Sequence, residues 1–137
     1  MKKNLKNVLL IASTSDMAQK LIHNLADDNV CVWAASRSNL NLELPNLKKF
    51  FLDVSDSNNI QNFFNEIKNV EFDAVVCFQG VAIVSPVEFL SDDELLRQLK
   101  ISVFSLLDIL KGLKNKIKKM ALLLTCLQCH LLEFTPF

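Results

Sequence analysis

One stretch near the start of the chain constrains the fold more than any other. Residues 8–18 read VLLIASTSDMA, a short apolar run that ends in small hydroxylated residues and passes directly into an amphipathic pattern. A continuous apolar run without alternation is typical of a buried parallel strand. A strand, a turn and a helix in direct succession are typical of α/β domains that hold a phosphate at the helix N-terminus. The turn contains no glycine, so the sequence leaves open whether this copy binds a nucleotide.

Strand and helix patterns alternate along the rest of the chain. Short apolar runs predict strands over residues 6–13, 29–35, 49–52, 72–78 and 121–125. Periodic apolar positions predict helices over residues 16–27, 57–67 and 91–113. A polar segment with Pro45, residues 36–46, connects the second and third strands. The alternation predicts an α/β fold with a doubly wound parallel sheet, Rossmann-like, of about five strands, and incomplete.

Capping residues and apolar faces support the predicted helices. Ser13, Thr14 or Ser15 can cap the first helix and Ser57 the second, whereas the third begins with a capping box formed by Ser91 and Glu94. The expected apolar faces are Met17, Ala18, Leu21, Ile22 and Leu25; Ile60, Phe63, Phe64 and Ile67; and Leu95, Leu96, Leu99, Val103, Leu106, Leu107, Leu110 and Leu113. Lysines 111, 114, 116, 118 and 119 then favour the C-terminal end of the third helix, because its dipole is negative there.

Composition limits the partners. Apolar residues make up 50% of the chain and charged residues 22%, with a formal net charge of zero, so we expect a globular domain that binds neither nucleic acid nor a membrane. The first apolar run is too short for a secretory segment and no run is long enough to span a membrane. We therefore expect a cytoplasmic protein with reduced cysteines. Residues 1–125 form the predicted domain, and residues 126–137 fit no element.

The final segment contains a spacing that also occurs in haem proteins. Cys126, Cys129 and His130 form a Cys-x-x-Cys-His pattern, the attachment site of c-type haem, and two cysteines at this spacing can be half of a zinc site. Haem attachment requires export, which the N-terminus does not indicate, and no second pair of zinc ligands is evident. We expect no metal site.

Four segments, in order, resemble one known family. Residues 12–18 (ASTSDMA) are similar to a Gly-Ala-Thr-Ser-Asp-Ile-Ala variant of the opening turn of short-chain dehydrogenases/reductases, with Ala12 in place of the first glycine. Residues 34–37 (AASR) resemble the end of that family's second strand, and residues 52–56 (LDVSD) its Leu-Asp-Val-Thr-Asp segment. Residues 73–80 (DAVVCFQG) stand where the family has Asp-x-x-Val-Asn-Asn-Ala-Gly, and share its closing glycine. The resemblance extends over residues 6–119, although Ser102 stands where the family carries a catalytic-site asparagine.

The resemblance implies an NAD(P)-dependent oxidoreductase, which transfers hydride between NADP(H) and an alcohol or carbonyl substrate. The cofactor-binding residues that it implies are Ala12, Ser13, Thr14, Ser15, Asp16, Met17, Ser36, Arg37, Asp53, Val54, Gln79 and Gly80. A basic residue at the position of Arg37 pairs with the 2′-phosphate of NADP in the family, so NADP(H) is expected in preference to NAD(H), and Asp53 is expected to face the adenine.

Each of these residues also has an explanation without a ligand. Arg37 can be an ordinary exposed arginine and Asp53 a turn residue that ends a strand. Gly80 implies a close backbone approach by either a cofactor or a neighbouring chain segment. The methyl group of Ala12 disfavours a positive φ, and the carboxylate of Asp16 repels phosphate.

The chain contains no candidate catalytic acid. The family's tyrosine, followed four residues later by a lysine, comes after the fifth strand, and this sequence has no tyrosine. We therefore expect the truncated chain to be inactive. The alternative to an oxidoreductase is a non-catalytic nucleotide-binding or interaction module.

A shift of reading frame is one explanation for the last residues. Lys118, Lys119 and Met120 require an A-rich run of codons, where slippage is easy. The shifted frame can read Gly-x-Ile-Val-Asn-Val-Ser-Ser-Met, which resembles the family's fifth strand and catalytic serine. A sheet left open beyond residues 122–124 would expose an apolar edge, so we expect homo-oligomers or aggregation.

Overall fold

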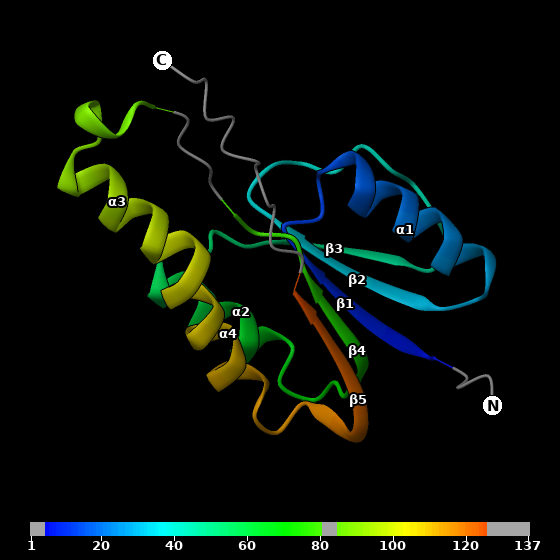
Figure 1. Ribbon diagram of the computed structural model, residues 1–137. Helices are drawn as coiled ribbons and strands as arrows, with labels where there is room; N and C mark the ends of the chain where they lie inside the picture. Colours follow the sequence, from blue (N-terminus) through cyan, green and yellow to red (C-terminus); the bar gives the residue numbers. More distant parts are fainter. Residues whose placement is uncertain (1–4, 81–84, 126–137) are drawn as a thin grey trace.

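A five-stranded sheet forms the centre of the computed structural model, which describes residues 5–80 and 85–125. All of its strand pairs are parallel. The strand order is β3-β2-β1-β4-β5 (Figure 1). The strands are β1 (Asn7–Ile11), β2 (Cys31–Ser36), β3 (Leu47–Phe51), β4 (Phe72–Cys77) and β5 (Ile117–Thr125). The predicted doubly wound, Rossmann-like sheet is thus confirmed.

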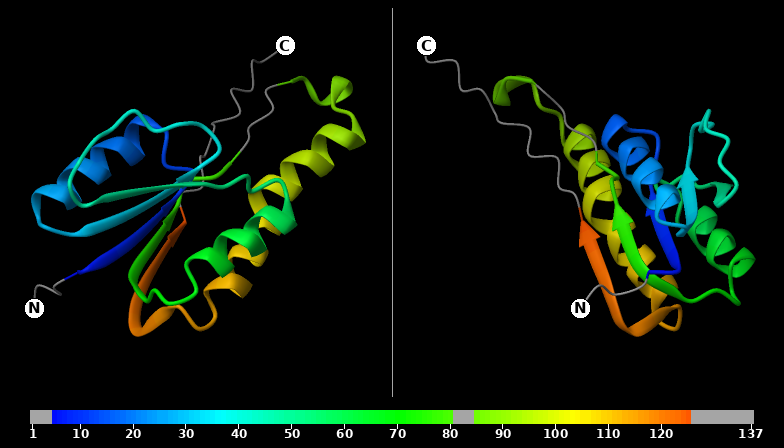
Figure 2. Two further views of the ribbon diagram at one scale, coloured as in Figure 1. Left: turned by 180° about the vertical axis from the view of Figure 1, so that it is seen from behind. Right: turned by 90° about the vertical axis from the view of Figure 1, so that its right-hand side faces the viewer.

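Helices cover both faces of the sheet. Helix α1 (Asp16–Asp27) lies on one face, and α2 (Ser57–Glu66) and α4 (Ser105–Leu113) lie on the other (Figure 2). A 3₁₀ turn, η1 (Val87–Phe89), precedes helix α3 (Asp92–Leu99), and a π-helical turn, η2 (Lys100–Phe104), joins α3 to α4. Helix α3 extends beyond the sheet (Figure 1). No helix in the described part of the chain is long and apolar enough to cross a membrane.

The apolar run of β1 is explained by its central position. Leu9 and Ile11 pack into the core cluster beneath α2 and α4, whereas Val8 and Leu10 pack into the cluster beneath α1. None of the four is more than 2% exposed. A strand buried on both faces needs no alternation of apolar and polar residues, which is why the sequence indicated a parallel sheet.

The helix starts agree with the sequence in two cases out of three. Ser15 caps α1 by accepting a hydrogen bond from the amide of Ala18, and the capping box at the start of α3 is present. Ser57 is not the cap of α2: that residue is Asp56, and the Ser57 hydroxyl instead donates a hydrogen bond to Asp108 on α4 at 2.9 Å. Aspartate and serine are both good caps, so tertiary contacts decided between them.

The third predicted helix differs most from expectation. The π-helical turn interrupts it, and α3 has no buried residue, with Leu95, Leu96 and Leu99 43–58% exposed. The α3 part of the expected apolar face therefore has no buried residue, whereas the α4 part packs on the core through Leu106 and Leu113. Helix α4 ends at Leu113 and β5 begins at Ile117, so the strand, not the helix, contains residues 118 and 119. Pairing of β5 with Phe72 of β4 draws the chain into the sheet at this point.

Candidate functional site

The carboxyl ends of β1, β2 and β4 meet at one edge of the sheet. Ile11 pairs with Ala35 of β2 and with Cys77 of β4. The amide of Phe78 donates a hydrogen bond to the Ile11 carbonyl at 2.9 Å. The strand order switches sides at β1, because β2 and β3 are added on one side of β1 and β4 on the other. Open α/β sheets bind ligands at such a switch point.

The turn between β1 and α1 has an unusual backbone. Ala12 has φ of +59°, in the left-handed region that glycine occupies most readily. Its amide donates a 2.8 Å hydrogen bond to the Ala35 carbonyl of β2, so the end of the sheet holds this conformation. The sequence predicted that alanine disfavours a positive φ, and the chain adopts one here despite that cost.

The residues after Ala12 form the N-terminus of α1. Ser13 is fully buried, and its Oγ has no hydrogen-bond partner among the described residues. The Thr14 carbonyl accepts a 2.9 Å hydrogen bond from the Gln19 side chain. Asp16, the first residue of α1, is exposed. A buried hydroxyl without a partner beside a helix N-terminus is unusual, because buried polar atoms are nearly always paired.

Ser36 and Arg37 follow β2 at the same edge. Ser36 is buried and its hydroxyl donates to the Ser38 carbonyl at 2.7 Å, whereas Arg37 is exposed. Both residues line a hollow of about 310 Å³ that also includes Lys49 and Phe51 of β3. The guanidinium is therefore free to face a ligand at this edge.

Asp53 lies in a network of hydrogen bonds just after β3. The amide and hydroxyl of Ser55 donate to its carboxylate at 2.9 and 2.7 Å. These bonds lower the pKa of Asp53 below its ordinary value, and the charges of Arg37 and Lys100 lower it further. Arg37 and Lys100 thus lie close enough to Asp53 to act on it. Val54, the next residue, packs against the core cluster beneath α2.

Lys100 was not among the residues that the sequence pointed to. It lies in the π-helical turn η2, far from Asp53 along the chain, and belongs to no motif. Only its positive charge could have drawn attention to it. Such π-helical turns occur frequently at functional sites.

Gln79 and Gly80 follow β4. The Oε1 atom of Gln79 is buried without a hydrogen-bond partner in the described part of the chain, as is the hydroxyl of Ser13 at the end of the adjacent strand β1. Gly80 is exposed, and a Cβ built on it meets no described atom within 4 Å. A close approach of a neighbouring segment, one of the two explanations for this glycine, is therefore not seen among the described residues.

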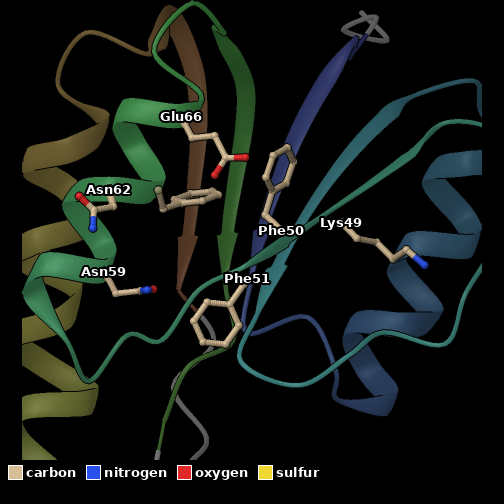
Figure 3. A pocket seen from close by; sticks show the side chains of 7 residues that line it. Lys49, Phe50, Phe51, Asn59, Asn62 and Glu66 are labelled. Carbon is tan, nitrogen blue, oxygen red and sulfur yellow. The ribbon is translucent and has the colours of Figure 1, made fainter.

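Other predicted features lie elsewhere. Met17 points away from the core on α1, where it is 61% exposed. A second hollow, of about 360 Å³, lies between β3 and α2 and includes none of the predicted site residues (Figure 3). Within residues 5–80 and 85–125, no group of histidine, cysteine and acidic side chains could hold a metal ion. Cys126, Cys129 and His130 lie outside the described residues.

Comparison with known proteins finds similarity at the level of structure. No protein-family model matches the chain, and no curated protein is similar to it in sequence. A short-chain dehydrogenase family protein from Francisella tularensis aligns with a TM-score of 0.82 and 23% identity, over 88% of this chain and 50% of that one. A short-chain dehydrogenase from Leptospira borgpetersenii with bound NAD⁺ aligns with a TM-score of 0.72 and 14% identity, over 78% and 44%.

This chain has the fold of the short-chain dehydrogenases. A dehydrogenase/reductase of that type from Serratia marcescens also aligns, with a TM-score of 0.75 and 16% identity over 88% of this chain and 56% of that one. The chain spans about half the length of these short-chain dehydrogenase structures.

Proposed function

We propose that this chain is the nucleotide-binding part of an NAD(P)-dependent oxidoreductase of the short-chain dehydrogenase/reductase type. The observation that carries the proposal is the β1–α1 turn, where a left-handed Ala12 leads past a buried, unpartnered Ser13 hydroxyl to the N-terminus of α1. Amides at a helix N-terminus attract phosphate. The turn lies at the switch point of a sheet whose structural relatives include a dehydrogenase with bound NAD⁺.

The residues present fit a dinucleotide. Backbone amides from Ser13 to Met17 would hold the pyrophosphate, and the Ser13 hydroxyl offers a donor that nothing else in the described residues uses. The exposed Asp16 carboxylate weakens this anion site without closing it. Gln79 and Gly80, after β4, would lie on the other side of the crevice. When bound, the nicotinamide would supply or accept the hydride.

We propose that the nucleotide is NADP(H) rather than NAD(H). Arg37 is exposed beside the 310 Å³ hollow at the end of β2, and a guanidinium binds phosphate with two parallel hydrogen bonds. Asp53, whose depressed pKa keeps it ionised, lies within reach of the same arginine charge and would orient the adenosine side of the ligand.

Titration calorimetry with NADPH and NADH tests this choice of nucleotide. Arg37→Ala should weaken NADPH binding by about tenfold, the loss expected for one charge-assisted contact, and change NADH binding by less than about twofold. Arg97→Ala, the same substitution at an exposed arginine of helix α3 that does not line the hollow, is the matched control and should change neither affinity. Equal affinity of the unaltered chain for both nucleotides would refute the NADP preference, and binding of neither would refute the proposed function.

We propose that the chain binds nucleotide without turning over substrate. The 137 residues contain no tyrosine, so the acid that the resemblance requires is missing, and a non-catalytic nucleotide-binding module is the corresponding function of the chain by itself. Oxidation of NADPH by the purified chain with any simple carbonyl substrate would refute this part of the proposal.

We further propose that the residues after Lys119 are translated out of frame. The nucleotide sequence of the gene tests this, because a shift of one nucleotide should restore the hidden serine motif and a later Tyr-x-x-x-Lys. Residues 126–137 lie outside the described residues.

A cytoplasmic location and association through the sheet edge are also proposals. Strand β5 is the last strand of the described sheet, and an uncovered edge strand favours pairing with another chain. Light scattering after size-exclusion chromatography should find oligomers or aggregates, and a single monomeric species would contradict this.

A further inference from the structure

The connection between β2 and β3 is unusual for parallel strands. Strands β2 and β3 pair in parallel, yet residues 37–46 between them contain no helix. Leu40 is 4% exposed, and it packs with Leu42 and Leu44 against the core cluster beneath α1. Parallel strands are usually joined through a helix, which satisfies its own backbone groups. This loop must find partners for its carbonyls elsewhere.

Lys49 of β3 supplies hydrogen-bond donors to two of these loop carbonyls. Its Nζ donates to the carbonyls of Leu42 and Leu40 at 3.3 and 3.5 Å and forms an ion pair with Glu43 at 2.5 Å. The side chain extends to the opposite side of β3 from Asn62 and Glu66 of α2 (Figure 3). An ammonium group has three donors and no acceptor, so one side chain can hold three groups of the loop.

The same loop forms one wall of the hollow beside Arg37. Ser38, Asn39 and Leu40 line this hollow together with Arg37, and Lys49 lies in its wall as well. A displacement of Leu40 or Leu42 would therefore move the segment that carries the guanidinium. Lys49 thus contacts the same loop three to six residues after Arg37.

We propose that Lys49 is a positioning residue for recognition of the 2′-phosphate of NADP. By holding residues 40–43, it fixes the loop so that Arg37, Ser38 and Asn39 meet the phosphate together. This inference rests on the proposed function, because it concerns one end of the same nucleotide site. The NADH affinity should be insensitive to Lys49, since NADH has no phosphate for the loop to meet.

The test compares two adjacent lysines of one strand. Lys49→Met should weaken NADPH binding by about fivefold in titration calorimetry and leave NADH binding within about twofold. Lys48→Met is the matched control: Lys48 lies over the Trp33 ring at 4.2 Å, and the variant should leave both affinities within about twofold. Lys49→Arg, which keeps the donors, should restore most of the NADPH affinity. An equal loss for both nucleotides, or no loss relative to the control, would overturn the inference.

Glu43→Gln separates loop positioning from simple charge. This variant weakens the ion pair to Lys49 but also removes a negative charge near the hollow. If Lys49 acts by holding the loop, NADPH binding becomes weaker. If Lys49 acts only through its charge, NADPH binding becomes tighter, and the positioning role is refuted.

Hydrogen exchange of the nucleotide-free chain tests the loop independently of ligand binding. The amide of Leu47, which donates to the Leu44 carbonyl at 3.1 Å at the end of the loop, should exchange about tenfold faster in Lys49→Met than in Lys48→Met, while the amides of β1 stay unchanged. Unchanged exchange in the loop would overturn the inference even if the chain binds NADPH. Failure of the unaltered chain to bind any nucleotide would count against the proposed function, and therefore against the role in phosphate recognition, whatever the exchange shows.

Discussion

Replacement of Ala12 by glycine should stabilise the protein. Ala12 has φ of +59°, and its amide is fixed by the 2.8 Å hydrogen bond to Ala35, so the residue cannot relax to a negative φ without loss of that bond. The left-handed conformation costs an L-residue with a Cβ about 1–2 kcal/mol. Glycine avoids this cost but gains entropy in the unfolded chain worth about 0.4–1 kcal/mol. The net gain in the free energy of unfolding for Ala12→Gly is then about 1 kcal/mol.

Chemical and thermal unfolding measure this gain. For a domain of this size, about 1 kcal/mol corresponds to a rise in Tm of about 3–5 °C, with the denaturant m-value unchanged. Asn29→Gly is the matched control, because Asn29 also has φ of +59° but asparagine adopts this conformation readily. The control should leave the Tm unchanged or slightly lower. No stabilisation by Ala12→Gly, or equal stabilisation by both variants, would refute the argument from backbone strain.

Three further predictions concern packing and protonation. Gly112→Ala should lower the free energy of unfolding, measured by urea titration, by about 1–3 kcal/mol, because the new Cβ would clash with the Phe64 ring. This loss should outweigh the higher helix propensity of alanine. Gly80→Ala, whose Cβ meets no described atom, is the control and should leave the free energy of unfolding unchanged. Because the pKa of Asp53 is lower in the folded chain than its ordinary value of 3.8, the ionised carboxylate stabilises the fold at pH values above 3.8, and this stabilisation is lost as the pH falls further. The Tm difference between the unaltered chain and Asp53→Asn should therefore shrink as the pH falls from neutral to below 3.8. A constant difference would contradict this. Burial raises the pKa of Cys77 to about 12, so iodoacetamide at neutral pH should label this residue only after unfolding, as peptide mass spectrometry can show; rapid labelling of the folded chain would contradict it.

Local patterns account for the parts of the fold that the sequence predicted well. The bounds of α1, the buried face of α2 and the capping box at Ser91 follow from residue spacing and from hydrogen bonds between near neighbours. The uninterrupted apolar run of β1 predicted a strand buried on both faces, and it is the centre of the parallel sheet. These features need only a few consecutive residues to specify them.

The candidate site was predicted less completely. The resemblance indicated the segments after β1, β2, β3 and β4, and parallel pairing brings their ends to one edge of the sheet. It did not indicate Lys100, which acts on Asp53, or Lys49, which holds the loop beside Arg37. Neither lysine belongs to a motif, because its effect depends on a contact with a residue that only folding brings near.

The sequence by itself therefore determined the class of fold, the order of its elements and the turn that begins the candidate site. Only the tertiary structure decided that Ala12 takes a left-handed conformation, because the hydrogen bond that its amide donates to the Ala35 carbonyl of β2 fixes it there. The exposure of the leucines of α3 likewise depends on the tertiary structure, because the same apolar pattern is buried or exposed according to where the helix lies relative to the sheet. Periodicity encodes which residues share a face, whereas the partner of that face depends on packing between distant parts of the chain.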